Sequence, residues 1–461
     1  MRRLLDFLRI DDIPLLTRVN YLAELQQMTL WGAVAGAVEG SLASIIASKT
    51  FDASRLLTTI IWALPVLMNI LNLGWGSILR GRRRKPAFFI VATCGLIAVG
   101  SIGLTPAGSQ PWNAWIFAAQ IGCTHLFLSG LITLRTTMWK VNYPTSHRAR
   151  IAGRLQTLRL LLTLITASGL SLVFNKQPDA YRLLYPFVAV VGALSLWPLR
   201  RLRMRGERSE LRQFREHVAQ RNGGDDRPRL GLRAGLREAS TILRTDKLFA
   251  KYMLSQFLLG AANFFTDPIL VNALTKDLRF DYFSAQAILF LIPSAALLGS
   301  IRFWAPYFDR IGVLRFRIYN SACWVLSYAG ISVAMVILTI GGREALPVVI
   351  PILVVGRLFN GLGRGGGAIA WNLGHLHFAG EHQTELYMGI HVGLTGLRGL
   401  LMPLLGLGAT MLFGYPAILI ALGLAATAHI MFRQLAASEQ KRLSQSALHD
   451  AGGSPPGDDA S

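Results

Sequence analysis

Long apolar stretches follow one another along this 461-residue chain, and they constrain its fold more than any other feature. A helix needs about 20 largely apolar residues to cross the hydrocarbon layer of a bilayer. Only helices and closed barrels satisfy every backbone hydrogen-bonding group there, and the sequence lacks the strict alternation of barrel strands. It therefore predicts an all-α membrane protein with twelve transmembrane helices. The predicted spans are 28–48, 56–79, 87–106, 112–138, 151–174, 183–199, 248–274, 283–307, 314–340, 346–371, 386–411 and 414–433.

The basic residues lie very unequally on the two sides of these spans. The net charge of +22 would suggest nucleic-acid binding in a soluble chain. With the N-terminus placed inside, however, 37 of the 47 Lys and Arg residues fall in internal segments, 7 in external loops and 3 within spans. This asymmetry is that of the positive-inside rule, although the internal loop 372–385 has no basic residue. We expect a multi-pass protein of a bacterial inner membrane with both termini in the cytoplasm.

The longest hydrophilic stretch divides the spans into two groups of six. Residues 200–251 include 15 basic and 7 acidic residues, and their only aromatic residues are Phe214 and Phe249. This composition favours contact with anionic lipid rather than nucleic acid. The sequence thus predicts a cytoplasmic interfacial segment at 1–27, a six-helix bundle at 28–199, a basic cytoplasmic linker at 200–247, a second six-helix bundle at 248–433 and a disordered cytoplasmic tail at 434–461.

The two groups of spans repeat one another. Similar residues recur at separations that increase slowly along the chain, from 228 to 232 residues. The pairs are Pro65 and Pro293, Trp75 and Trp304, Gly130 and Gly361, and Trp139 and Trp371. Because each half has six spans, both halves start on the same side of the membrane, and the repeats are parallel. Two parallel-repeat six-helix bundles are the architecture of an alternating-access carrier.

Two loops carry related patterns, G-S-I-L-R-G-R-R-R-K-P at 76–86 and A-P-Y-F-D-R-I-G at 305–312. With the duplication, they make the chain similar, over nearly its whole length, to the major facilitator superfamily, whose signature is G-x-L-a-D-r-x-G-R-K-P. The resemblance implies that superfamily's fold. It also implies conformational-switch loops that brace neighbouring helices through Gly76, Arg84, Lys85, Asp309, Arg310 and Gly312. Asp309 would accept hydrogen bonds from a helix N-terminus and a nearby arginine. Arg80 replaces the aspartate of the first copy, so a topogenic charge cluster is the alternative for 80–85.

Two further patterns of the superfamily are displaced in this chain. The pattern R-x-x-q-G-x-g, usual in the fourth span, occurs as R-L-F-N-G-L-G at 357–363 in the tenth, and His125 takes the arginine's place in the fourth. The fifth span lacks the G-P-x-x-G-G kink that often accompanies proton antiport. The resemblance therefore does not favour an antiporter.

Ionisable groups within spans are costly in lipid, so each is a functional candidate. Glu39 lies in the middle of the first span, and a buried charge needs a partner. We expect Glu39 to lie within reach of a cation such as Arg357 or Arg398 and to carry a proton. The candidates for the solute and proton pathway are Glu39, Asn69, Asn72, His125, Asn263, Asp267, Arg357, Asn360, Arg364, His391 and Arg398.

These candidates also have structural interpretations. Glu39 can be an ion-pair partner that never titrates. Helix capping, packing or hydrogen bonding between helices can account for Asp267, His125, His391, Asn69 and Asn72. Arg135 and Arg159 are expected to extend to the membrane interface. The histidines of 372–385 suit a solvated loop better than a metal site, and the three cysteines are expected to be buried thiols.

The sequence therefore predicts a secondary active transporter that moves a small solute by alternating access, coupled to protons. Three arginines and two acids within spans favour an anionic or zwitterionic solute. The sequence contains neither a Walker loop nor a catalytic constellation, so we expect no ATP-driven pump, no enzyme, no cofactor and no metal. Expected partners are the solute, protons or another coupling ion, and membrane lipids, but not nucleic acid, and the chain is expected to be a monomer. Two alternatives stay open: a facilitated-diffusion uptake carrier and a non-transporting membrane receptor on the same scaffold.

Overall fold

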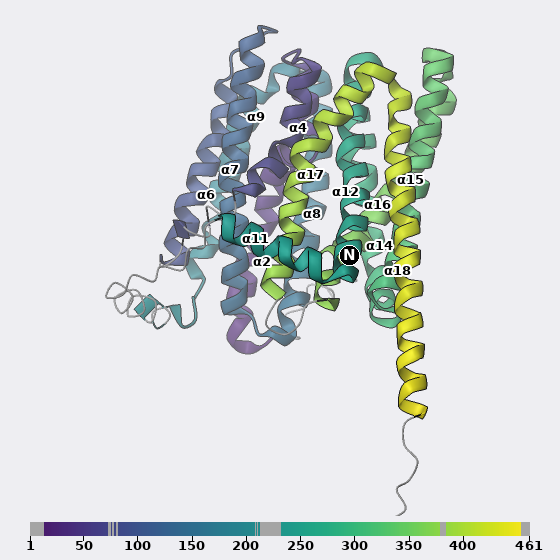
Figure 1. The fold of residues 1–461 in the computed structure, drawn as a ribbon. Coiled ribbons are helices and arrows are strands. Elements are labelled where there is room, and N and C mark those ends of the chain that lie inside the picture. The colour runs from purple at the N-terminus through teal and green to yellow at the C-terminus, as the bar shows by residue number, and fades with distance from the viewer. Residues whose placement is uncertain are drawn as a thin grey trace, which may run out of the picture.

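In the computed structural model the chain is a bundle of long helices that lie side by side (Figure 1). The structure describes residues 13–71, 75, 78–79, 82–207, 209, 211–212, 232–378 and 384–452. Within these residues there are helices and turns but no β-strand. The predicted all-α fold class is confirmed for this part of the chain.

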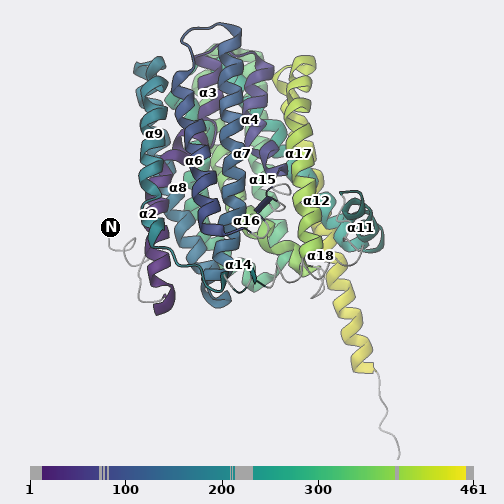
Figure 2. The ribbon, with the colours of Figure 1, turned by 90° about the vertical axis from the view of Figure 1, so that its left-hand side faces the viewer.

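The long helices of the first half pack against one another in neighbouring pairs. Its helices are α2 (Leu15–Val38), α3 (Leu42–Lys49), α4 (Arg55–Ile70), α6 (Arg84–Ser101), α7 (Pro111–Asn142), α8 (Thr145–Lys176) and α9 (Tyr181–Ser195). Helix α2 contacts α8 and α9, and α6 contacts α7 and α9 (Figure 2). At the crossing of α2 and α8, a Cβ on Gly36 would lie 2.9 Å from the carbonyl oxygen of Thr163. The glycine therefore permits a close approach, as small residues do between membrane helices.

The second half packs in a similar way around α12 and α16. Its helices are α12 (Lys247–Asn272), α13 (Tyr282–Gln286), α14 (Ile292–Ile311), α15 (Val313–Gly341), α16 (Leu346–Leu373), α17 (Thr384–Phe413) and α18 (Leu419–Gly452). Helix α12 contacts α17 and α18, and α16 contacts α14 and α15. Two π-helical segments, η4 (Ala273–Asp277) and η5 (Ala287–Leu291), interrupt the regular helices around α13.

The last part of the linker lies against the second half. Helix α11 (Leu232–Thr245) runs across the bundle rather than along it (Figure 1). Asp246 then caps α12, because one carboxylate oxygen accepts the backbone N–H of Phe249 at 2.9 Å. Its other oxygen accepts the hydroxyl of Tyr387 on α17 at 3.0 Å. We call the end of the molecule that carries 82–85 and 198–203 the linker end. The end that carries 49–55 and 276–281 is the distal end.

The same tryptophan contact occurs once inside each half. The indole N–H of Trp75 donates to the carbonyl oxygen of Leu126 on α7, and that of Trp304 donates to the carbonyl oxygen of Leu362 on α16. A Cβ on Gly130 would lie 2.7 Å from the Trp75 ring, and one on Gly366 would lie 3.0 Å from the Trp304 ring. The glycine that faces the second tryptophan is therefore Gly366 and not Gly361, which the sequence comparison had paired with Gly130.

Ten stretches of the described chain are long and apolar enough to cross a membrane. One of them, Val313–Trp371, includes both α15 and α16, and the shorter apolar helix Arg55–Met68 stands outside the ten. The number of crossings thus stays a prediction at twelve. The multi-pass helical character of the chain is plain from these stretches.

Two predicted boundaries and the continuity of the first span are wrong. Residues 15–27, expected to form an interfacial segment, are the first turns of α2, whose Tyr21 and Glu24 are buried. The first span is not one helix, since α2 ends at Val38 and α3 begins at Leu42. The tail expected to be disordered from 434 continues α18 to Gly452. The rest of the interfacial segment, 1–12, and of the tail, 453–461, lies outside the described residues.

Candidate functional site

The break between α2 and α3 places Glu39 at a helix end inside the bundle. Glu39 has extended backbone angles (φ −92°, ψ 159°), and Gly40 follows with φ +77°. An L-residue rarely adopts such a positive φ, so glycine suits the position. A Cβ on Gly40 would also lie 2.6 Å from the ring of Phe290 in η5, which belongs to the other half. The break is thus a contact point between the two halves.

Neighbouring side chains satisfy the carbonyl groups that the break releases. A ring nitrogen of His125 on α7 lies 3.1 Å from the carbonyl oxygen of Val38. The hydroxyl of Tyr185 on α9 donates to the carbonyl oxygen of Ala37 at 3.1 Å. Unpaired backbone carbonyls are costly away from water, so these two contacts stabilise the interrupted helix. His125 therefore has a structural role here, whatever else it does.

The carboxylate of Glu39 pairs with Arg159 on α8. One guanidinium nitrogen donates to both carboxylate oxygens, at 2.6 Å and 2.8 Å. The expectation that Arg357 or Arg398 would be the partner was wrong, and so was the expectation that Arg159 extends to the interface. The Glu39 side chain is 34% exposed and that of Arg159 is 21% exposed. This pair is therefore only partly closed off.

A second ion pair lies in the other half and is sealed. Arg357 on α16 donates to Asp267 at 2.8 Å, and the Arg357 side chain is 0% exposed. It also donates to the carbonyl oxygens of Ile288 and Leu289, at 3.0 Å and 2.5 Å. Both carbonyls belong to the π-helical segment η5, whose wide turn makes backbone oxygens available. Asp267 is thus the counter-ion of a buried arginine.

Two further pathway candidates in the second half, Arg364 and Arg398, lack a carboxylate partner among the described residues, as does the buried Arg317. Neither Arg364 nor Arg398 forms a salt bridge with any residue that the structure describes. Arg398 is 6% exposed and donates to the carbonyl oxygen of Gln256 and, at 2.8 Å, to the hydroxyl of Thr395. Its Nε has no hydrogen-bond partner among the described residues. The second half therefore carries an excess of buried positive charge.

Aromatic rings surround the Arg398 guanidinium. Its central carbon lies 6.0 Å and 5.9 Å from the ring centroids of Phe257 and Phe264 on α12. Phe264 in turn packs edge-on against Trp62 of α4, with ring centroids 6.0 Å apart, so the cluster joins the two halves. Asn263, next to Phe264, is half-buried. Cation–π contact stabilises the arginine without neutralising it.

The remaining pathway candidates differ in how they are placed. Asn360 is 1% exposed, and neither polar atom of its amide has a partner among the described residues. His391 is buried, and its ring centroid lies 5.2 Å from that of Trp371. Asn72 lies outside the described residues, as does the side chain of Asn69. Within the described chain, no group of three or more potential metal ligands occurs.

The two proposed switch loops behave differently. The ammonium group of Lys85 donates to the carbonyl oxygens of Arg200 and Leu202, at 2.7 Å and 3.2 Å. The backbone N–H of Arg84 donates to Glu207 at 2.6 Å. The first loop therefore braces the segment that follows α9, while Gly76 and Arg80 lie outside the described residues.

The second switch loop ends α14 without forming a brace. Asp309 and Arg310 are exposed, and Asp309 accepts no hydrogen bond from a described residue. The expectation that Asp309 accepts such bonds is therefore wrong for this conformation. Gly312 has φ +73° and no atom within 4 Å of a Cβ, so its glycine ends the helix rather than permitting a contact.

Sequence reasoning missed Glu24, a buried acid near the linker end. Glu24 is 4% exposed and accepts hydrogen bonds from the indole N–H of Trp139 and, at 3.0 Å, from the hydroxyl of Tyr143. Both donors are neutral. Nearby, Arg135 donates to Gln27 at 3.0 Å. The sequence places Glu24 in the predicted interfacial segment 1–27. A carboxylate on a membrane surface is solvated and needs no partner, so the sequence does not identify Glu24 as a buried acid.

At the distal end, hydrogen bonds and ion pairs join the two halves. Among the described residues seven pairs cross between them: Ser48 with Thr275 (2.8 Å), Thr50 with Tyr282 (2.9 Å), Asp52 with Lys276 (3.1 Å), Arg55 with Asp277 (2.9 Å), Thr59 with Asn272 (3.2 Å), Asn175 with Asp281 (2.7 Å) and Asn175 with the backbone N–H of Phe283 (3.3 Å). Burial raises the pKa of Asp281, but hydrogen bonds from Ser284 and Asn175 outweigh it and hold the pKa below its usual value. The distal end is therefore closed in this conformation.

Comparison with known proteins identifies the fold. No family model matches the sequence, and no curated protein matches it. Among solved structures, a D-xylose–proton symporter superposes with a TM-score of 0.62 and 12% identity over 90% of this chain and 96% of its own. A POT family transporter in complex with 5-aminolevulinic acid gives 0.61 and 10% over 94% and 99%. A mutant of the nucleoside transporter NupG gives 0.60 and 15% over 91% and 99%.

The chain has the major facilitator fold. The fold that the sequence resemblance implies is confirmed. Because identities of 10–15% show the fold alone, the major facilitator fold locates the bundles but assigns no solute.

Proposed function

We propose that this chain is a secondary active transporter that moves a small solute across the membrane by alternating access, with protons as the coupling ion. The observation that carries the proposal is the closure of the distal end by contacts between the halves, in a chain with the major facilitator fold. In a two-bundle carrier, such contacts form in one state and break in the other. By the distribution of basic residues the distal end is external, so this conformation is closed to the outside.

Proton coupling rests on the difference between the two ion pairs. Arg357 is locked by three acceptors and fully buried, which suits a structural brace. Among the described residues the Glu39 carboxylate has only Arg159 as a partner, and its side chain is about one-third exposed, so a proton can reach it. Protonation of Glu39 would remove the counter-charge from Arg159 and free its guanidinium for a solute. The position of Glu39 at the helix break would then link protonation to the contact between Gly40 and Phe290.

The charges favour an anionic or zwitterionic solute. Arg364 and Arg398 have no salt-bridge partner among the described residues, and a solute carboxylate or phosphate would supply the missing charge. The aromatic rings beside Arg398 would contact an apolar or planar part of the same molecule.

The test uses purified protein in proteoliposomes with an imposed pH gradient. We expect accumulation of an anionic solute that depends on the gradient. Glu39→Gln should abolish the pH dependence but leave exchange of solute across the membrane. Glu344→Gln is the matched control, since Glu344 is exposed, lies outside both switch loops and accepts no hydrogen bond from a described residue. Accumulation by Glu39→Gln at the wild-type rate would refute the coupling role.

Facilitated diffusion is the second candidate. Each of the two ion pairs lies within a single half, Glu39 with Arg159 in the first and Asp267 with Arg357 in the second, so rocking of the halves need not break either pair. If flux proceeds down the solute gradient but never depends on pH or another ion, this second function is the correct one. Absence of any flux, with solute still bound, would instead indicate a receptor.

A further inference from the structure

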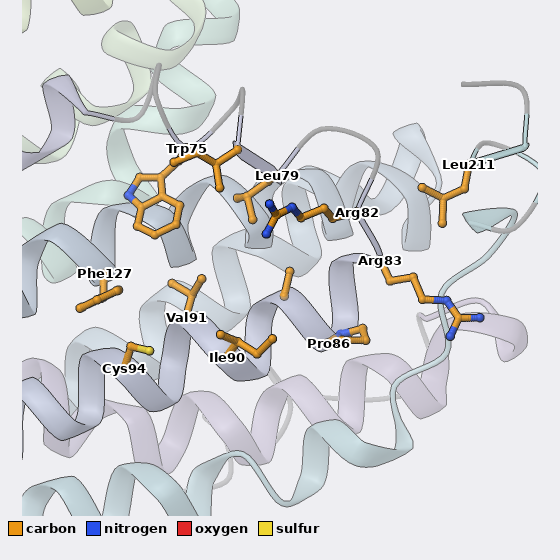
Figure 3. A pocket seen from close by; sticks show the side chains of 12 residues that line it. Trp75, Leu79, Arg82, Arg83, Pro86, Ile90, Val91, Cys94, Phe127 and Leu211 are labelled. Carbon is orange, nitrogen blue, oxygen red and sulfur yellow. The ribbon is translucent and has the colours of Figure 1, made fainter. Parts of the chain in front are cut away.

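A cavity of about 480 Å³ opens on the side of the first half, at the linker end (Figure 3). Most of its wall is apolar and comes from α6, from Trp75, Ile78 and Leu79 between α4 and α6, and from Phe127 of α7. The wall residues include Leu79, Ile90, Val91, Cys94 and Phe127. Arg82 and Arg83 stand at one end of it, and Leu211 of the linker stands at the same end (Figure 3). The cavity is therefore apolar along its length and basic at its mouth.

The apolar wall lies on the outer surface of the bundle, at the depth of the membrane. Ile90, within the membrane-spanning stretch Arg84–Leu104, is 65% exposed, and Ile97 further along the same helix is 67% exposed. From Arg83, at the start of α6, to Cys94 the helix rises about 16 Å, at about 1.5 Å per residue. One leaflet of a bilayer has a hydrocarbon depth of about 15 Å, half of the usual 30 Å. The groove is thus as deep as one acyl chain is long.

The basic mouth has unused hydrogen-bond donors. Arg82 and Arg83 are exposed, and neither side chain donates to a residue that the structure describes. Their neighbour Lys85, by contrast, is occupied by two backbone carbonyls. In Figure 3 the guanidinium of Arg82 reaches back over the apolar wall near Leu79. In Figure 3 the guanidinium of Arg83 points away from that of Arg82, so the two side chains give the mouth a positive charge without forming a single fork, and such a charge attracts an anionic headgroup.

We propose that this groove binds one anionic phospholipid, with its headgroup at the basic mouth beside Arg82 and Arg83 and an acyl chain along α6 towards Cys94. Basic pockets between membrane helices on one leaflet are suited to anionic headgroups. The lipid would connect the switch loop at 82–85 to the linker through Leu211. This site is separate from the ion pairs of the bundle, and the proposal does not depend on the transport function.

The experiment measures phosphatidylglycerol and phosphatidylcholine bound to the purified full-length chain by native mass spectrometry. Two basic residues near the headgroups favour an anionic lipid by roughly 30-fold, from about one kcal/mol each. We expect that preference in the wild type and its loss in Arg82→Gln/Arg83→Gln. Arg201→Gln/Arg244→Gln is the matched control, because it removes two exposed basic residues that do not line the groove. Equal preference in all three, or equal loss in both variants, would overturn the proposal.

A second measurement locates the acyl chain. In a Cys123→Ser/Cys323→Ser background, Cys94 is the remaining thiol of the three in the chain. Phosphatidylglycerol should slow alkylation of Cys94 by a maleimide at least severalfold relative to phosphatidylcholine, and Arg82→Gln/Arg83→Gln should remove the protection. Soluble glycerol phosphate, which has no acyl chain, should not protect. Protection by glycerol phosphate, or no protection by the lipid, would show that no acyl chain occupies the groove.

Discussion

The sealed pair of Asp267 and Arg357 allows a sharp test of how this structure is stabilised. Asp267→Asn removes the only carboxylate that the described residues offer to Arg357, whose side chain is 0% exposed. Removing one partner of a buried ion pair costs about 3–5 kcal/mol. Two backbone carbonyls still accept from Arg357, so we expect a loss near the lower limit, about 3 kcal/mol. Glu39→Gln, at a pair that is one-fifth to one-third exposed, should cost about 1 kcal/mol or less.

Both variants should be compared by unfolding the purified protein with increasing SDS and following its tryptophan fluorescence. A third variant, Asp267→Asn/Arg357→Met, removes both charges and should recover part of the loss. Recovery would be incomplete, because the carbonyl oxygens of Ile288 and Leu289 would lose their donor. If Asp267→Asn is no less stable than Glu39→Gln, or if the double variant is no more stable than Asp267→Asn, the idea of a sealed structural brace is wrong.

Three further predictions concern the break, the distal end and the uncompensated arginine. Gly40→Ala should slow transport severalfold, because a Cβ would meet Phe290 at a strained φ; Gly108→Ala, with positive φ but open space, is the control, and equal effects would contradict this reasoning. Wild type should be more stable than Asp281→Asn at neutral pH. The pKa of Asp281 is lower in the folded than in the unfolded protein, so its carboxylate stabilises the fold at any pH above its unfolded-state pKa. That advantage should vanish in melting curves as the pH falls below about 4, and a pH-independent difference would refute it. Arg398→Met should raise the KM for an anionic solute roughly 10-fold to 100-fold, from the loss of a charged hydrogen bond, and an unchanged KM would remove Arg398 from the binding site.

The sequence predicts the helical class and most spans because apolar length is a local property. The sequence does not predict the ion-pair partner of Glu39, because that partner depends on how two long helices, α2 and α8, are placed along each other. The fifth span was placed at 151–174, which set Arg159 near one end. Helix α8 in fact begins at Thr145, so Arg159 lies near its middle and at the depth of Glu39. A shift of about two turns at a helix start therefore decided which arginine pairs.

The break in the first span was hidden for a related reason. Gly36 and Gly40 both read as small residues in an apolar run, yet only Gly40 has a positive φ. The helix can break at Gly40 because His125 and Tyr185 bind the released carbonyl groups of Val38 and Ala37. Both side chains are remote from Gly40 in the sequence. Glu24 was missed because its donors, Trp139 and Tyr143, come from α7 and the turn after it. Tertiary contacts of this kind leave no periodic signal.

Helix α18 has a mechanical consequence. Its membrane-spanning stretch ends at Lys441, and the helix continues to Gly452, about 16 Å further at about 1.5 Å per residue. In Figure 1 this extension stands clear of the bundle. Because α18 packs against α12 and α15, its tip is a lever fixed to the second half. A spin label there would sweep a larger arc than any label inside the membrane, and would report the tilt of one half directly.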